Sequence, residues 1–304
     1  MYLFNNPILF QTIINEVDNR YKYGKAFIEK DYYLSLILYE ISKLNEDIVF
    51  KGGTSLSKAY HAIERFSEDV DLSFPYHIGE ARRKKLKYNV MKAVSEKTGI
   101  SITNFQKTES DKDLNEYIFP YNTVLDSTNN IKTFIKVETA LMFDSFPIER
   151  RIIQSFIGEY ISNNSDGGFL ETYPELKPFT MNVQTIERTF IDKYFAICDC
   201  YLQKRSNRIS RHLYDLYMLE NKIKYNDEFK SIFNRLKIIR ANNELCPSSK
   251  EGINLFDLVN TIIQTHYYKD DYQKVTKEFI YGKTPSYDDV CKSILRINER
   301  INKL

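Results

Sequence analysis

The chain has 304 residues, of which 42% are hydrophobic and 28% charged, and its formal net charge is +2. This composition excludes a disordered chain and is typical of a globular protein with one large or two modest domains. The longest apolar runs, such as 34–38, are too short to span a bilayer, and the N-terminus lacks the basic-then-apolar order of a secretion signal, so we expect a cytoplasmic protein with no membrane partner.

Two helices are predicted before the first strand. Apolar residues recur at helical spacing over 7–21 and again, more strongly, over 29–44. The second helix begins with consecutive charges, Glu29, Lys30 and Asp31. The interpretation we favour is that the two acidic residues stabilise the positive end of the helix dipole.

A short apolar run at 48–50 predicts a buried strand that ends at Gly52 and Gly53. Thr54 or Ser55 is the expected N-cap of a helix that reaches about Glu64, because a hydroxyl can accept from a free first-turn N–H. A helix that begins at a glycine turn presents its N–H groups and its dipole to an anion. The stretch therefore suits a phosphate group.

The residues that follow predict a second strand. Val70, Leu72 and Phe74 alternate with Asp69 and Asp71, which is the period of a strand with one buried face. The alternation places both aspartates on the same face, where they can hold one hard cation. A phosphate turn followed by a carboxylate pair suggests chemistry on a nucleoside triphosphate.

The next segment, 79–98, predicts a helix with a basic run from Arg82 to Lys87. Such a run is usually a solvated helix face, and we favour that interpretation because no aromatic residues are interleaved for base stacking. The alternative is a contact with a nucleic-acid backbone, whose affinity is dominated by lysine and arginine.

Strand-forming residues dominate 100–105, 116–124 and 132–141, with a turn at 126–130. In the last of these strands Lys136 and Glu138 share a face. A single glutamate in a strand is more often solvent-facing, but beside the aspartate strand it would complete a three-carboxylate metal site. The sequence leaves that adjacency open.

A polar segment with glycines and prolines at 163–178 is the expected domain boundary, so we predict domains at 1–170 and 171–304. The second domain is expected to be helical throughout. The fold class is therefore α+β: an N-terminal mixed β-sheet with flanking helices, then an all-helical domain. The predicted helices are 184–203, 210–221, 227–241, 255–266, 268–281 and 286–302. The cysteines lack the spacing of a zinc site and are expected to be buried free thiols: Cys198, Cys200, Cys246 and Cys291.

Two charged clusters interrupt this helical half. Lys193 lies on a helix with an apolar face, and by itself it is equally well a surface lysine. Arg211 and Asp215 are four residues apart, which is the spacing of an intrahelical ion pair worth a few tenths of a kcal/mol, ~0.3–0.5. Taken separately, neither cluster indicates a function.

The motifs become informative when they are taken together, in their order along the chain. Gly-Gly-Thr-Ser-Leu-Ser-Lys at 52–58 is followed by Arg-Phe-Ser-Glu-Asp-Val-Asp-Leu at 65–72, with matching segments at 29–32, 135–138, 187–193 and 211–216. This set resembles the AbiEii/AbiGii toxin family of nucleotidyltransferases, relatives of the MenT toxins in the DNA polymerase β-type superfamily. The resemblance covers roughly residues 25–220 and implies a nucleotidyltransferase-type mixed sheet followed by a helical domain.

The resemblance implies transfer of a nucleotide from an NTP with release of pyrophosphate. Asp69 and Asp71 would bind Mg²⁺ or Mn²⁺, and Glu138 would complete a second metal site or take the proton from the attacking hydroxyl. Lys193 would contact the triphosphate, and Asp215 would order that lysine. The residues that the resemblance assigns to nucleotide binding are Lys51, Gly52, Gly53, Thr54, Ser55, Arg65, Ser67, Lys193 and Arg211, of which Arg65 and Ser67 would also brace the aspartate strand.

The acceptor that the resemblance suggests is RNA, specifically tRNA, and the partner is a cognate antitoxin that acts without stable contact. The first alternative is a nucleotidyltransferase that acts on a protein or a small molecule. The second is a nucleotide-binding regulator without catalysis, which the intact carboxylate pair disfavours because a binding module needs no metal pair.

Overall fold

The protein is described by a computed structural model that covers residues 1–128, 131–164 and 167–304. The predicted turn at 126–130 and the predicted boundary segment at 163–178 each lie partly outside these described residues. The chain forms two compact units. Unit 1 comprises Met1–Tyr60 and Ser67–Gln184, and unit 2 comprises His61–Phe66 and Thr185–Leu304.

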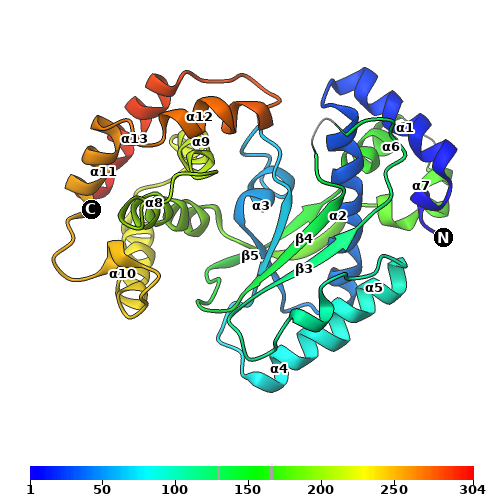
Figure 1. Ribbon diagram of the computed structural model, residues 1–304, viewed down its shortest axis with the longest axis horizontal. Helices are drawn as coiled ribbons and strands as arrows, with labels where there is room; N and C mark the ends of the chain where they lie inside the picture. The colour runs from blue at the N-terminus through cyan, green and yellow to red at the C-terminus, as the bar shows by residue number, and fades with distance from the viewer. Residues whose placement is uncertain (129–130, 165–166) are drawn as a thin grey trace. The chain divides into compact units, whose positions relative to one another are not determined.

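Within its described residues, unit 1 contains a six-stranded mixed sheet in the order β3-β4-β2-β1-β6-β5 (Figure 1). β2 runs antiparallel to β1 and parallel to β4, so the middle of the sheet has mixed directions. The strands are β1 Val49–Lys51, β2 Asp69–Ser73, β3 Leu114–Pro120, β4 Phe134–Ala140, β5 Ile148–Ile153 and β6 Phe179–Gln184. The expected mixed sheet is confirmed.

One face of this sheet is the core of unit 1. Val70, Leu72 and Val137 are at most 1% exposed and belong to the same apolar cluster as the inner residues of the long helix α2, Lys25–Leu44. Figure 1 shows α2 running along the sheet, and it packs against β2, β4 and β6. Because strand side chains alternate, covering this face leaves Asp69 and Asp71 on the opposite one.

The helices predicted for unit 1 are present, but their lengths differ from the predicted ones. The expected helix after the glycine turn ends at Lys58 instead of near Glu64, and it begins at Gly52, so neither Thr54 nor Ser55 is its N-cap. No strand forms over 100–105 in this described stretch, whereas β5 and β6 were not predicted. The helices are α1 Pro7–Tyr21, α2, α3 Gly52–Lys58, α4 Glu80–Lys85, α5 Lys92–Thr98, α6 Phe156–Asn164 and α7 Gly168–Thr172, with a π-helical link at Leu86–Met91 between α4 and α5.

The charges near the start of α2 correct an expectation. The helix begins at Lys25, so Glu29 and Asp31 lie in its second turn, beyond the reach of the helix dipole argument. Glu29 is fully buried, Lys30 is 4% exposed and Asp31 is 9% exposed. Buried charges require partners, and these residues find them in other segments of unit 1.

Most of these partners lie at the ends of the elements around the aspartate strand and the glycine turn. Lys30 pairs with Glu68, the residue before Asp69, at 3.2 Å and donates to the carbonyl of Lys132 at 2.9 Å, just before β4. Asp31 pairs with Lys58, the last residue of α3, at 2.6 Å. Glu29 accepts from the N–H of Val124 at 2.7 Å. The start of α2 therefore fixes the ends of the elements that carry the candidate site.

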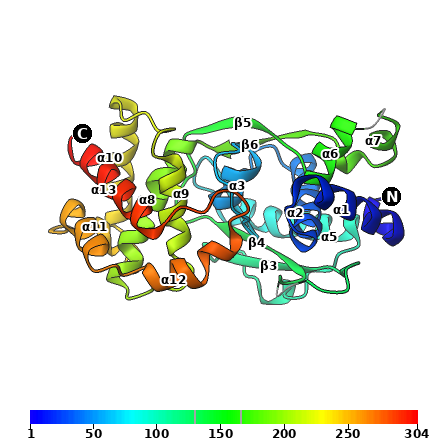
Figure 2. The ribbon, with the colours of Figure 1, turned by 90° about the horizontal axis from the view of Figure 1, so that it is seen from above.

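Unit 2 is built from helices, as predicted (Figure 2). Its core is rich in aromatic rings; Phe195 and Phe233, for example, stack with centroids 5.1 Å apart. The short segment His61–Phe66 joins this unit through a bridge between Arg65 and Ile280. The helices are α8 Ile186–Leu202, α9 Ser210–Leu219, α10 Asp227–Ala241, α11 Leu255–Gln264, α12 Lys269–Lys274 and α13 Tyr287–Asn302.

The four cysteines are buried free thiols, as expected from the sequence. None of the helices in the described part of the chain combines the length and the apolar character needed to cross a bilayer.

Candidate active site

The exposed face of the central strands gathers the carboxylates that the sequence singled out. Asp71 in β2 lies opposite Glu138 in the parallel β4, and Asp69 lies opposite Lys136. Residues opposite each other in a ladder point to the same side of the sheet. The adjacency of Glu138 to the aspartate pair, which the sequence left open, is therefore present, and Lys51 of β1 joins the same face opposite Asp71.

The glycine turn lies directly against this face. Gly52 has a φ of +75°, and a Cβ built on it would meet Oδ2 of Asp71 at 1.9 Å. Only glycine combines this left-handed backbone with such a close approach of the carboxylate. Gly53, buried beside it, is the second residue of α3. The turn and the carboxylate strand thus form one structural element in unit 1.

The hydroxyls expected to contact a triphosphate are used within the protein. Ser55 donates to the carbonyl of Gly52 at 2.9 Å, and Thr54 donates to the carbonyl of Asp69. Both side chains are at most 1% exposed. Their direct effect in this structure is to bind the glycine turn to itself and to β2. Ser67, half-buried, lies in the segment that leads into that strand.

Lys136 is a member of the site that the sequence analysis did not assign. Its ammonium lies 3.8 Å from Oδ2 of Asp69 and 3.5 Å from Oε1 of Glu116, and it also pairs with Glu138. Partial burial lowers the pKa of Lys136, but the hydrogen bond to Glu138 and the charge of Asp69 outweigh it, so the pKa is raised. Its period-two spacing from Glu138 was the signal that it shares this face.

The side chains on this face fit a hard divalent cation in donor type. Carboxylate oxygens are the ligands that Mg²⁺ prefers, and Asp69, Asp71 and Glu138 supply them from adjacent strands. Within 1–128, 131–164 and 167–304, however, no three Asp, Glu, His or Cys side chains converge as a ready metal-binding group. Instead, the ammonium of Lys136 is the cation that Asp69 and Glu138 share.

Unit 2 assembles a second set of the expected residues. Arg65 donates through Nε and Nη2 to the two carboxylate oxygens of Asp215, at 2.6 and 2.7 Å. The ammonium of Lys193 lies 2.7 Å from Oδ2 of the same carboxylate. All three side chains are at most 6% exposed. The carboxylate of Asp215 therefore pairs with both Lys193 and Arg65. Arg211, one turn before Asp215, donates to the carbonyl of Arg208 at 3.3 Å.

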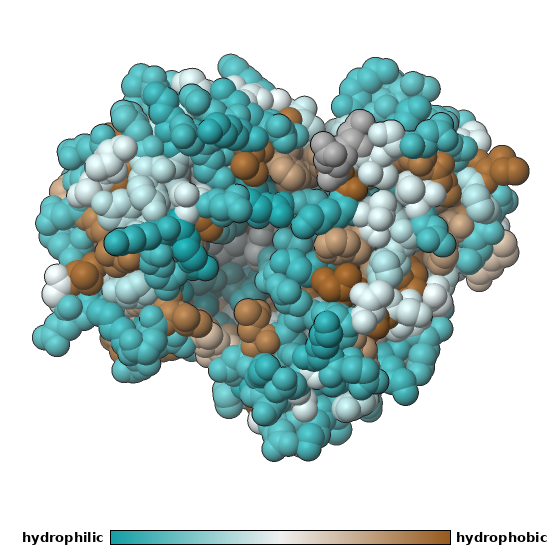
Figure 3. Space-filling view, in the orientation of Figure 1, coloured by the Kyte–Doolittle hydropathy of each residue, from teal (hydrophilic) through white to brown (hydrophobic). Residues whose placement is uncertain are grey.

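The basic run of α4 and the following π-helical turn is only partly a solvated face. Arg83 is 9% exposed and donates to Asp113 at 2.7 Å, and Lys87 is 8% exposed and donates to the carbonyl of Thr108 at 2.6 Å. For these two residues the expected solvation is wrong, because they tie the helix to the loop before β3. The surface over α4 is largely hydrophilic (Figure 3), and its exposed basic residues are Arg82, Lys84 and Lys85.

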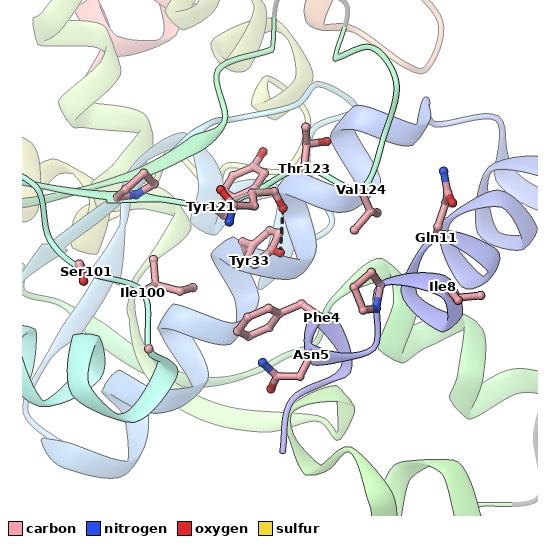
Figure 4. A pocket seen from close by; sticks show the side chains of 14 residues that line it. Phe4, Asn5, Ile8, Gln11, Tyr33, Ile100, Ser101, Tyr121, Thr123 and Val124 are labelled. Atoms are coloured by element: carbon pink, nitrogen blue, oxygen red, sulfur yellow. Dashed lines mark hydrogen bonds between the residues drawn. The ribbon is translucent and has the colours of Figure 1, made fainter.

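A cavity of about 560 Å³ lies elsewhere in unit 1, between the N-terminal residues and the segment after β3 (Figure 4). Phe4, Tyr33 and Tyr121 contribute to its wall, and Tyr33 stacks on Tyr121 with centroids 4.1 Å apart. None of the 14 residues that line it is charged. A triphosphate needs cations or a metal, so this cavity does not compete with the carboxylate face as the NTP site.

Comparison with known families decides between the classes of protein that such a face could serve. Residues 36–293 match the family described as the nucleotidyl transferase AbiEii toxin of type IV toxin–antitoxin systems. The match contains the glycine turn, the carboxylate face and the Lys193–Asp215 cluster. The chain belongs to the AbiEii toxin family. It is a nucleotidyltransferase, and the resemblance read from its motifs is confirmed.

A solved nucleotidyltransferase toxin agrees with this AbiEii assignment at the level of the fold. The chain is similar to MenT4, a nucleotidyltransferase toxin from Mycobacterium tuberculosis H37Rv, with 15% identity and a TM-score of 0.61 over 97% of this chain and 90% of that one. It also matches JHP933 from Helicobacter pylori, with 16% identity and a TM-score of 0.47 over 92% of this chain and 93% of that one. A search of the curated proteins returned no match.

Proposed function

We propose that this AbiEii-family enzyme transfers a nucleotide from an NTP to an RNA acceptor, with tRNA as the first candidate, and that Asp69, Asp71 and Glu138 hold the Mg²⁺ or Mn²⁺ that the reaction uses. The observation that carries the proposal is the contact between Gly52 and the carboxylate of Asp71. It brings the glycine turn, which suits phosphate, against the strand that supplies oxygen ligands. A nucleotidyltransferase needs these two groups together.

The residues of this face suit the chemistry of transfer. An acceptor hydroxyl forms a new bond to the α-phosphorus, the bond from that phosphorus to the bridging oxygen breaks, and pyrophosphate leaves. Glu138 lies opposite Asp71 on the neighbouring strand, from where it either completes a metal site or takes the proton of the attacking hydroxyl. The metal, when bound, neutralises charge on the triphosphate. Gly52 accommodates the Asp71 carboxylate against the turn, and Gly53 beside it has no side chain to obstruct a phosphate oxygen that approaches the backbone.

Several features support the remaining parts of the proposal. Exposed Arg82, Lys84 and Lys85 offer an RNA-backbone contact. The family match supports a cognate antitoxin as partner. The ion pair with Asp215 supports a fixed position for Lys193, the lysine that we assign to triphosphate binding. Because NTPs and tRNA are cytoplasmic, we place the reaction in the cytoplasm.

A transfer assay tests the reaction and its acceptor. Each labelled NTP is incubated with Mg²⁺, total tRNA and either the native chain or Asp71→Ala. We expect label in tRNA with the native chain and a loss of at least about 100-fold with Asp71→Ala, because misplacing a catalytic cation by even 1 Å has that effect. Asp47→Ala is the matched control, since Asp47 lies in the loop before β1 and is exposed.

The other outcomes separate the alternatives. Label on a polypeptide would identify a protein as the acceptor, and label on a small metabolite would identify that metabolite as the acceptor. Nucleotide binding without transfer to any of these acceptors would contradict catalysis by this chain.

The α4 surface has its own test. We expect Lys84→Glu/Lys85→Glu to weaken tRNA binding and to reduce the slope of log K against log salt by about 1 for each lost phosphate contact. Lys292→Glu/Lys303→Glu, both exposed residues of unit 2, changes the net charge equally and is the control. Equal losses in the two double variants would show a nonspecific charge effect and would remove α4 from the proposal.

A further inference from the structure

The ammonium of Lys136 lies where carboxylates from three strands meet. It pairs with Glu138 on its own strand, approaches Asp69 on β2 at 3.8 Å and approaches Glu116 on β3 at 3.5 Å. The register explains the convergence, since Lys136 lies opposite Asp69 in one ladder, and Glu116 lies opposite Glu138 in the other. Lys136 therefore brings one positive charge to carboxylates from three strands.

Two of the carboxylates that Lys136 contacts, Asp69 and Glu138, are the proposed metal ligands. A carboxylate oxygen that accepts a hydrogen bond from an ammonium cannot give the same lone pair to a metal ion, and two cations bound to the same oxygens repel each other. At Oε1 of Glu138 the metal and Lys136 therefore compete for the same lone pairs, and at Oδ2 of Asp69, 3.8 Å from the ammonium, they compete through the repulsion between two cations.

The contacts of Lys136 are not needed to hold the sheet together. Its side chain is 24% exposed. β4 is bound on both sides by its backbone ladders with β2 and β3, and Ile135 and Val137 anchor the strand in the core at no more than 1% exposure. A lysine in such a position can leave its partners without unfolding the strand, so its charge can be replaced and the effect on the site measured.

We propose that Lys136 is a tethered cation that a divalent metal must displace from Asp69 and Glu138, so that this lysine sets the metal concentration that the site requires. The inference rests on the proposed metal use of this face. With the metal absent, the lysine keeps the carboxylates neutralised and in place. With the metal present, the released ammonium is free to meet the negative charge of an incoming triphosphate.

Mn²⁺ binding without nucleotide tests the inference directly. Free Mn²⁺ is measured by electron paramagnetic resonance in titrations of the native chain, Lys136→Gln, Lys136→Arg and Lys132→Gln. We expect Lys136→Gln to bind Mn²⁺ at least about fivefold more tightly than the native chain, the lower end of ordinary coupling between competing ligands. Lys136→Arg keeps the charge and should bind like the native chain. Lys132→Gln removes an equal charge from an exposed lysine just before β4 and should also leave binding unchanged.

The possible failures are distinguishable. Suppose that the native chain binds Mn²⁺ and that Asp71→Ala abolishes this binding. If Lys136→Gln then binds Mn²⁺ no more tightly than the native chain, displacement of Lys136 by the metal is contradicted, while the metal site itself stands. An equal gain in Lys132→Gln would reduce the effect to net charge and would also overturn it. Absence of Mn²⁺ binding in every variant would overturn the metal assignment itself, and the nucleotide-transfer assay would then stand alone as the test of the enzyme.

Discussion

Asp215→Asn should lower the free energy of unfolding by about 3–5 kcal/mol, because it leaves two buried cations without their shared anion. Arg65 and Lys193 are 3% and 4% exposed, and both bind the carboxylate of Asp215, which is itself fully buried. Neither cation can recover its hydration without opening the helices around it. Denaturant unfolding of the full chain, followed by circular dichroism, measures the loss.

Asp270→Asn is the matched control for this substitution. Asp270 is on α12 in the same unit, its side chain is 86% exposed, and it is 3.8 Å from Lys274 one turn away. An exposed pair of this kind contributes at most about 1 kcal/mol, so the control should unfold almost like the native chain. A loss for Asp215→Asn no larger than that of the control would contradict the role of Asp215 as the anion that holds Arg65 and Lys193 together.

The same carboxylate should make the native chain sensitive to acid. Burial alone would raise the pKa of Asp215, but Arg65 and Lys193 outweigh it and hold that pKa well below its usual range. A lowered folded-state pKa contributes stability that is complete above the unfolded pKa of about 3.9 and is lost as the pH falls below it. The stability difference between the native chain and Asp215→Asn should therefore shrink progressively in acid below about pH 4.

The features that could be predicted from the sequence are those with a local cause. The alternation around Asp69 and Asp71 indicates a strand with two unlike faces, and 227–241 forms α10 with the predicted bounds, because apolar spacing and Asn226 as N-cap act within a few residues of chain. The match of the glycine turn and the aspartate strand to one family also depends on an ordered set of short motifs, which a single sequence can show.

The features that could not be predicted depend on partners far along the chain. In the sequence Glu29, Lys30 and Asp31 resemble a polar helix start, yet each is buried and forms a hydrogen bond to a residue at least 27 positions away. β5 and β6 have weak strand patterns and gain their stability from pairing with each other and with β1. Tertiary partners also decide that Arg83 is a buried tie instead of a solvated charge.

The contacts of Lys136 also depend on residues far along the chain, so they could not be predicted from the sequence. The sequence placed it on the face of Glu138, but only the register of β4 against β2 and β3 shows that it meets carboxylates from both neighbours. A lysine two residues from a glutamate is ordinary in a strand. It becomes a competitor for a metal only when the strand beside it carries Asp69.

Gly52→Ala should abolish most of the nucleotide transfer while leaving the chain folded. The substitution has two separate costs. The backbone has a φ of +75°, where an L-residue is strained by about 1–2 kcal/mol, and the new Cβ would lie 1.9 Å from the Asp71 carboxylate. That carboxylate must move, and a displacement of about 1 Å at a catalytic group lowers the rate about 100-fold.

Gly99→Ala separates these two costs. Gly99 follows α5 with a φ of +73°, but a Cβ built on it meets nothing within 4 Å. Gly52→Ala should therefore lose at least as much stability as Gly99→Ala in denaturant unfolding, and only Gly52→Ala should lose transfer and Mn²⁺ binding. If Gly52→Ala transfers nucleotide at the rate of Gly99→Ala, the reaction does not require the Asp71 carboxylate to lie against the turn. Glycine would then be needed at position 52 only for the backbone conformation of the loop. Loss confined to Gly52→Ala would make the contact between turn and carboxylate part of the reaction.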